Sequence, residues 1–138
     1  WRCVAGGTPG RWIAIHNDIC VDVPGAIYST VNLRNIPMTH GGRIVAVKVR
    51  RGYIPAGSSP VSIQVRKHLA ATTPPPGTVD PGVAVLSAIL TIAAGAYSAS
   101  SVAFVAGTNI YATGDTYTVE VTAGPFPGSN LMVSLVGD

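Results

Sequence analysis

Acidic and histidine side chains are the groups in this sequence best suited to acid–base or metal chemistry, and they are scattered. The six acids and three histidines are Asp18, Asp22, Asp80, Asp115, Glu120 and Asp138, and His16, His40 and His68. Glycoside hydrolysis needs two carboxylates that face each other across a cleft. Asp18 and Asp22 flank one short predicted strand, and we interpret them as turn-capping residues. His16 and Asp18 lack a third nearby ligand, so we predict no metal site.

Motifs for nucleophilic or nucleotide chemistry are not found in the sequence either. No serine lies in a nucleophile-elbow motif, and there is neither a phosphate-binding loop nor a dinucleotide fingerprint. We interpret Ser58–Ser59 and Ser98–Ser101 as loop hydroxyls, and Asp115, after Gly114, as a turn residue that bonds nearby backbone amides. We therefore predict a non-enzymatic protein without a cofactor. A small hydrolase is the least favoured alternative.

Tyrosines supply the recognition chemistry of the chain. The candidate ligand-binding residues are Tyr28, Tyr53, Tyr97 and Tyr111. Each lies near a predicted strand end or loop, where its ring can stack on a sugar while its hydroxyl bonds a neighbouring group. The alternative for each tyrosine is an amphipathic residue that closes the edge of the core.

The two cysteines, Cys3 and Cys20, fit neither a zinc pattern nor a redox Cys-x-x-Cys motif. Cysteine is among the most buried residue types even without a disulfide, so we predict free, buried thiols. Pairing across neighbouring strands is the alternative, because the sequence does not supply the distance between them.

Charge is sparse in this chain of 138 residues, of which 11% are charged and 47% are hydrophobic. Soluble monomers normally cover themselves with charge and interface cores are depleted of it, which favours an assembly over a free Ser/Thr-rich surface. The formal net charge is +3, with the excess in Arg43–Arg51 and Arg66–Lys67. Neither segment has interleaved aromatics, so we predict no nucleic-acid partner. The apolar stretch Val83–Ala96 is short and interrupted, so we predict no membrane insertion.

Strand patterns separated by turns recur along the chain. The clearest is Thr116–Thr122, in which Tyr117, Val119 and Val121 point one way and three threonines and Glu120 point the other. The second face suits either solvent or a neighbouring subunit. Further strands are predicted at Ile19–Val23, Ile27–Leu33, Arg43–Arg51, Val61–Lys67, Val85–Ala93, Val102–Val105, Asn109–Ala112 and Leu131–Val136.

Two of these strands carry more detailed expectations. Within Arg43–Arg51, the period of two places Val45, Val47 and Val49 on one face. Val85–Ala93 is apolar on both faces and is predicted to be a central strand, with a helix as the alternative. The predicted loops are Asn35–Gly42, Thr72–Gly82 and Gly124–Gly128.

About eight closely spaced strands, antiparallel by default, predict an all-β protein with an antiparallel β-sandwich of jelly-roll type. Trp1–Ile15 is predicted to form a short N-terminal hairpin around the Ala5–Gly10 turn. The expected organisation is a hairpin or connector element over residues 1–15, followed by a sandwich domain over residues 16–138.

The start of the chain reads Trp-x-Cys-x-x-x-Gly-Thr-Pro-Gly-x-Trp over Trp1–Trp12. This element, about a tenth of the chain, resembles one found in bacteriophage tailspikes and tail fibres, where it lies next to C-terminal modules. Ala56–Lys67 and Thr113–Val121 resemble strands of the β-sandwich modules that end many phage fibres.

The resemblance implies a homotrimer on the exterior of the virion that locks the trimer or binds the host surface. The implied partners are other virion proteins and a host cell-surface glycan. Depolymerase activity in such proteins resides in a separate upstream β-helix, which nothing in this sequence matches. The alternative functions are a capsid decoration or other structural virion protein, and a secreted carbohydrate-binding module.

Overall fold

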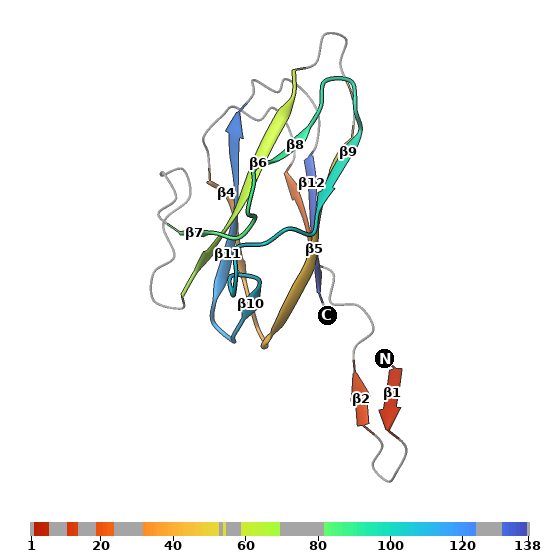
Figure 1. The fold of residues 1–138 in the computed structure, drawn as a ribbon, viewed down its shortest axis with the longest axis vertical. Helices are drawn as coiled ribbons and strands as arrows, with labels where there is room; N and C mark the ends of the chain where they lie inside the picture. The colour runs from red at the N-terminus through yellow and green to blue at the C-terminus, as the bar shows by residue number, and fades with distance from the viewer. Residues whose placement is uncertain are drawn as a thin grey trace.

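The computed structural model describes residues 2–5, 11–13, 19–23, 32–52, 54, 59–69, 82–123 and 131–137. Within these residues the chain is all-β and contains no helix (Figure 1). The strands are β1 (Arg2–Ala5), β2 (Arg11–Ile13), β3 (Ile19–Val23), β4 (Asn32–Pro37), β5 (Gly42–Arg51), β6 (Val61–His68), β7 (Val83–Ala84), β8 (Leu90–Ile92), β9 (Ser98–Ser101), β10 (Ile110–Tyr111), β11 (Thr116–Ala123) and β12 (Leu131–Gly137).

Ten of the described strands form two antiparallel sheets, which confirms the predicted β-sandwich. The first sheet has the order β10-β5-β12-β3, with β9 also paired to β5. The second has the order β4-β11-β6-β7, with β8 also paired to β6. The ten strands of these two sheets exceed the predicted eight because β5 and β6 each pair along one edge with two short strands. The remaining two strands, β1 and β2, pair with each other as the predicted hairpin.

The strand pairs nest inside one another along the chain. The first strand of the sandwich, β3, pairs with the last, β12, and β4 pairs with β11. Inside these, β5 pairs with β9 and β10, and β6 pairs with β7 and β8. Strands from the first half of the sandwich therefore pair with strands from its second half in reverse order, and these pairs alternate between the two sheets.

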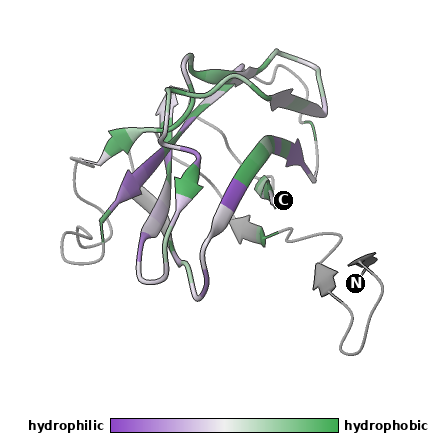
Figure 2. Cartoon of the chain, turned by 60° about the horizontal axis from the view of Figure 1, so that its bottom comes forward, coloured by the Kyte–Doolittle hydropathy of each residue, from purple (hydrophilic) through white to green (hydrophobic). Residues whose placement is uncertain are grey.

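The core lies between the two sheets and draws on alternate residues of their long strands. Tyr117, Val119 and Val121 are fully buried, as the alternation in β11 predicts. They lie on the same face as Ile63 and Val65 of the neighbouring β6. Figure 2 shows that both hydrophobic and hydrophilic residues occur on the strands of the two sheets.

A β-bulge shifts the inner face of β5. Val136 pairs with Ala46 and Gly137 pairs with Ile44, so Val45 is left without a counterpart on β12. Such an extra residue exchanges the two faces of a strand. Ile44, Val47 and Val49 are buried, whereas Val45 is only partly buried. The predicted face of three valines is therefore wrong at Val45, and Ile44 takes that place in the core.

The predicted loop at Asn35–Gly42 is wrong at both ends. Its first three residues continue β4 and pair with Thr116–Thr118 of β11, and Gly42 begins β5. Proline is tolerated in edge strands because no ladder donor is needed on the solvent side. Pro37 ends the edge strand β4, so it does not interrupt the sheet.

The segment from residue 85 to residue 105 also differs from prediction. Val85–Ala93 is neither one central strand nor a helix, because a bend at residues 87–88 separates an isolated bridge at Leu86 from β8. Val102–Val105 is not a strand, although Phe104 bridges to Leu86. The strand lies just before it, at Ser98–Ser101, where loop hydroxyls were expected, because Ala99 packs on the core there.

The other predicted strands agree with the structure within a few residues. They correspond to β3, β5, β6, β10, β11 and β12. Of Ile27–Leu33, only the last two residues are described, and they begin β4. The predicted loop Gly124–Gly128, all of Thr72–Gly82 except Gly82, and the boundary between residues 15 and 16 lie outside the described residues.

Gly42 provides a direct test of the packing at the start of β5. A Cβ at this position would lie 2.5 Å from the Tyr111 hydroxyl and 2.7 Å from its Cζ. Because the Tyr111 ring is buried, it has little room to move aside. We expect Gly42→Ala to lower the free energy of unfolding by about 1–3 kcal/mol, measured by denaturant titration.

Gly41→Ala is the matched control, because a Cβ there meets only the Tyr111 carbonyl oxygen at 3.4 Å. We expect this variant to unfold within about 0.5 kcal/mol of the wild type, as ordinary surface changes do. Equal stability of the two variants would contradict the packing described for Gly42 and Tyr111.

Candidate functional site

The four candidate tyrosines differ in whether the structure describes them and in how exposed they are. Tyr28 and Tyr53 lie outside the described residues. Tyr111 is only 4% exposed, and its ring makes edge-to-face contacts with Tyr117 and His40 at centroid distances of 6.0 and 6.1 Å. Its ring therefore has no free face for a sugar, and burial raises the pKa of its hydroxyl. Tyr97 is 61% exposed and is the described tyrosine that remains a candidate.

Tyr97 is held in position by its backbone while its side chain faces solvent. Its carbonyl oxygen accepts a hydrogen bond of 2.8 Å from the Arg51 amide, where β9 begins to pair with β5. The next residue, Ser98, lies opposite Arg50, and Ser100 lies opposite Lys48. The exposed ring is thus adjacent to a strand pair that carries hydroxyls and two cations.

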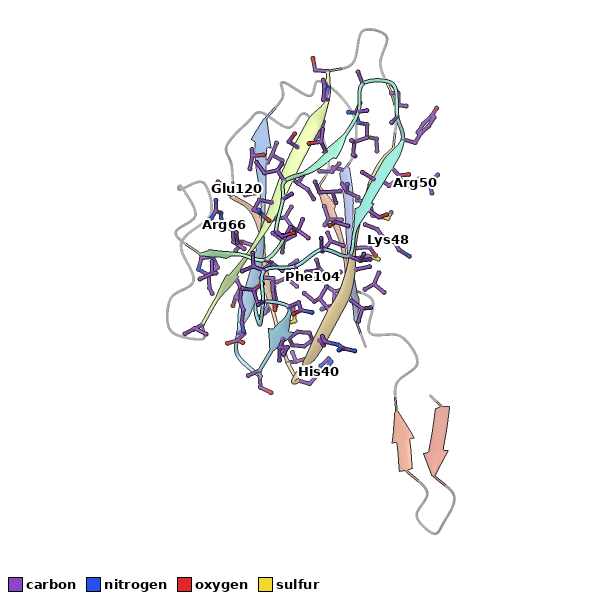
Figure 3. All side chains as sticks on the ribbon, in the orientation of Figure 1. His40, Lys48, Arg50, Arg66, Phe104 and Glu120 are labelled. Atoms are coloured by element: carbon purple, nitrogen blue, oxygen red, sulfur yellow. The ribbon has the colours of Figure 1, made fainter. Side chains whose placement is uncertain are left out.

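The outer surface of the first sheet, here called the β5 face, extends from β9 to β3. Its side chains are those of Ser98, Ser100, Lys48, Arg50, Met132, Ser134 and Cys20. Figure 3 shows Lys48 and Arg50 pointing away from the sandwich. On β3, Asp22 is the acidic residue of the cross-strand row that contains Arg50 and Met132. The face is largely polar, and the cations Lys48 and Arg50 are exposed on it.

Cys20 belongs to this surface, which corrects one expectation. It is a free thiol, as predicted, but it is exposed rather than buried. Its Sγ lies 3.1 Å from the Ser134 Oγ, within hydrogen-bond distance. β3 is the edge strand of the first sheet, and Cys20 is exposed on it. The side chain of Cys3 lies outside the described residues.

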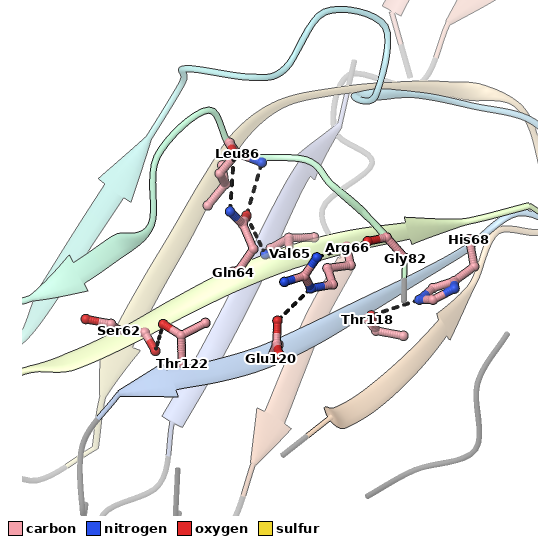
Figure 4. A network of polar contacts seen from close by, with 10 residues as sticks. All are labelled: Ser62, Gln64, Val65, Arg66, His68, Gly82, Leu86, Thr118, Glu120 and Thr122. Carbon is pink, nitrogen blue, oxygen red and sulfur yellow. Dashed lines mark hydrogen bonds and ion pairs between the residues drawn. The ribbon is translucent and has the colours of Figure 1, made fainter. Parts of the chain in front are cut away.

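Glu120 of β11 and Asp115, which directly precedes β11, are both ion-paired within the fold. Glu120 accepts a hydrogen bond of 2.6 Å from Arg66 Nε, and Arg66 Nη1 also donates to the Gly82 carbonyl (Figure 4). Asp115 Oδ2 lies 3.0 Å from Lys67 Nζ. Both acids therefore have partners that suit a structural role.

Asp115 acts as the predicted turn residue. Its Oδ2 accepts a hydrogen bond of 3.0 Å from the Ala112 amide, and Gly114 between them has a φ of 91°. The Ala112 amide and the neighbouring Lys67 hold the pKa of Asp115 below its usual value, although burial opposes them. Lys67 also donates to the Ile110 carbonyl, so one cation links β6 to this turn.

The polar face of β11 is buried within a single chain. Thr116, Thr118 and Glu120 are each less than a tenth exposed, so this face is not the open or subunit-facing surface that its composition suggested. Figure 4 shows Thr118 beside His68, whose Nε2 lies 3.4 Å from the threonine hydroxyl. On the same side, Gln64 exchanges hydrogen bonds with both backbone groups of Leu86.

Arg51 is a polar core residue, which the sequence analysis had counted only as part of the basic segment Arg43–Arg51. It is 1% exposed, and its Nη2 donates to the carbonyls of Ser59 and Ile92 at 2.9 and 3.2 Å. Burial lowers its pKa. The available signal was its two-residue spacing from Val47 and Val49, which places all three on the inner face. Arg51 thereby links β5 of the first sheet to the chain around β8 of the second.

The described histidines do not cluster with other residues that could bind a metal ion. His68 is buried against Thr118, and exposed His40 contacts Tyr111 and lies with its Nδ1 3.3 Å from the Thr39 hydroxyl. Among the described residues, no three His, Cys, Asp or Glu side chains gather as metal ligands would. No helix in this part of the chain has the length and apolar character needed to cross a membrane.

Exposed hydrophobic side chains concentrate on residues 83–111, here called the closing segment. Of the eight large hydrophobic side chains that are exposed among the described residues, six belong to it. They are Val83, Ile89, Tyr97, Val102, Val105 and Ile110. No charged residue or histidine lies between Asp80 and Asp115. The sequence did not indicate this surface, because its apolar runs Val85–Ala93 and Val102–Val105 were both predicted to be strands of the sandwich.

The fold defines the chain as an antiparallel β-sandwich with nested strand pairs. No protein-family model, no curated protein and no solved structure matches the chain.

Acid unfolding tests the role of Asp115. Because its pKa is lowered in the folded state, the ionised carboxylate stabilises the fold above the unfolded pKa of about 4. This contribution is lost as the pH falls through the lower, folded pKa. We expect Asp115→Asn to reduce Tm near neutral pH and to flatten the fall of Tm between about pH 5 and pH 2, measured by calorimetry. A variant that loses Tm in acid as steeply as the wild type argues against this role.

Proposed function

We propose that this chain is a non-enzymatic structural module of a phage virion, at the C-terminal end of a tail fibre or tailspike. It acts in homotrimer assembly and in adhesion to the host surface, on the outside of the particle. Its partners are two further copies of the chain, neighbouring virion proteins and a host cell-surface glycan.

The virion part of the proposal is supported by the element Trp1–Trp12, which resembles a tailspike and tail-fibre element. In the structure this element contains the two paired strands β1 and β2, with Cys3 opposite Trp12 and Arg2 opposite Ile13. The element therefore contains two antiparallel strands, which agrees with the hairpin predicted for it.

The jelly-roll class is supported by the nested strand pairs. If β7 with β8 and β9 with β10 each count as one interrupted strand, eight positions pair first with last, second with seventh, third with sixth and fourth with fifth. Two four-stranded sheets connected in this way match the double Greek key of a jelly roll, an architecture common in capsid and lectin domains. Such a domain suits both assembly and adhesion.

The observation that carries the assembly part is the uncharged, hydrophobic surface of the closing segment. Val102, for example, is 73% exposed although it is aliphatic. Large exposed apolar patches on soluble proteins mark sites of interaction. A module with such a surface is expected to bury it against another protein.

The adhesion part is supported by Tyr97 and the β5 face. An exposed aromatic ring, neighbouring serine hydroxyls and the cations of Lys48 and Arg50 can stack on a sugar and bond its hydroxyl or acidic groups. Each site is small and open, so three copies presented together would act by avidity.

The trimer is tested by native mass spectrometry, with light scattering at micromolar concentration as a second measurement. We expect a species of three times the chain mass. A monomer at all accessible concentrations would contradict the trimer. A monomer that still binds glycans would favour the secreted carbohydrate-binding module instead.

Adhesion is tested on a glycan array with the wild type and with Tyr97 variants. We expect Tyr97→Ala to reduce binding by roughly tenfold or more, because an exposed aromatic contact of this kind is worth about 1–3 kcal/mol. Tyr97→Phe, which keeps the ring, should retain most of the binding. Unchanged binding by Tyr97→Ala would remove this residue from the site.

A further inference from the structure

We infer that copies of this chain associate through the closing segment, with Ile89, Val102 and Val105 in the contact. The partner is a second copy of the chain. This inference deepens the proposed function and rests on its homo-oligomer, and it assigns a particular surface to that assembly.

The closing segment is a fixed surface of the sandwich. It leaves the second sheet through β7 and β8, which pair with β6, and returns to the first sheet as β9 and β10, which pair with β5. Between these strands, the Val85 amide bonds the Val65 carbonyl at 2.8 Å, and the Val105 amide bonds the Val85 carbonyl at 2.9 Å. Figure 1 shows the segment crossing from one sheet to the other.

The segment already buries the side chains that its own fold requires. Val85, Leu86, Leu90 and Ile92 lie in the core, and Phe104 packs partly against it. Figure 3 shows Phe104 near the middle of the molecule, between the two sheets. The exposed Val102, in contrast, has no role in this core. The outward hydrophobic side chains are therefore in excess of what one chain needs.

The charge distribution favours a second copy as the occupant. Interface cores are depleted of charged residues, and the closing segment has none. On the β5 face, Lys48 and Arg50 outnumber the one acid of the cross-strand row, Asp22, so two β5 faces in contact would bring an excess of positive charge together. Two closing segments meet without that repulsion. An anionic partner or an acidic lipid surface would instead be attracted to the β5 face.

The size of the surface also agrees with an interface between copies. Ile89, Val102 and Val105 lie on two stretches of chain that the Leu86–Phe104 bridge holds side by side. At on the order of 100 Å² for each fully exposed side chain, these three residues present about 200–300 Å², in the range of the patches that mark interaction sites. A standard interface covers roughly 800 Å² per partner, with an apolar core inside a more polar rim. Exposed alanines, serines and threonines of the same segment, such as Ala88, Thr91 and Ala103, extend the patch.

The test is a double variant, Ile89→Lys with Val102→Lys, measured beside the wild type by native mass spectrometry and light scattering. Both side chains are exposed in the single chain, so the fold should persist, which circular dichroism and Tm verify. Burying the two lysines at a contact would require desolvating unpaired charges. We expect the oligomer of the wild type to become a monomer at the same concentration, with at least a 100-fold rise in its dissociation constant.

Met132→Lys is the matched control. Met132 is another exposed hydrophobic residue, but it lies on the β5 face, so this variant should keep the oligomer of the wild type. If the folded double variant remains oligomeric, the closing segment is not the interface, and the proposed trimer stands on another surface. A monomeric wild type overturns both the inference and the trimer. Loss of the oligomer in the Met132 variant alone would assign the contact to the β5 face.

Discussion

The packing of two central strand pairs against each other, β5–β12 and β6–β11, is the contact on which the rest of the structure depends. Val49 lies opposite Val133 in the first pair and Val65 opposite Val119 in the second, and all four side chains are essentially fully buried. Burial of such side chains contributes about 1.5–3 kcal/mol each. The outer strands, the closing segment and the turns are all arranged around these four strands.

Local irregularities let the chain satisfy that packing along its whole length. The bulge at Val45 exchanges the faces of β5 at its start, so that Ile44 enters the core there, while Arg51 enters the core at the other end by its regular spacing from Val47 and Val49. Gly42 leaves room for the Tyr111 ring, and Arg51 reaches two backbone carbonyls from inside. Each irregularity thus lets the two sheets pack on one core with the side chains that the sequence provides.

The few charged side chains of the chain are distributed unevenly between the two sheets and the closing segment. Arg66, Lys67, Glu120 and Asp115 neutralise one another in pairs around β6 and β11, within or at the edge of the fold. On the first sheet, Lys48 and Arg50 of β5 are exposed whereas Arg51 is buried, and the closing segment has no charged residue. The molecule therefore presents two surfaces of different chemistry, a polar, cationic sheet face and an uncharged apolar segment, which suit different kinds of contact.

By itself the sequence determined the all-β class, most long strands and the turn at Asp115, because alternation and turn chemistry are local properties of neighbouring residues. The tertiary structure decided the rest. Asn35–Pro37 is a strand because it pairs with β11. Val85–Ala93 is not one strand, because Leu86 bridges to Phe104 whereas Leu90–Ile92 pairs with β6. The burial of Tyr111, and the exposure of Val102, depend on partners distant in the chain, and no local pattern specifies such partners.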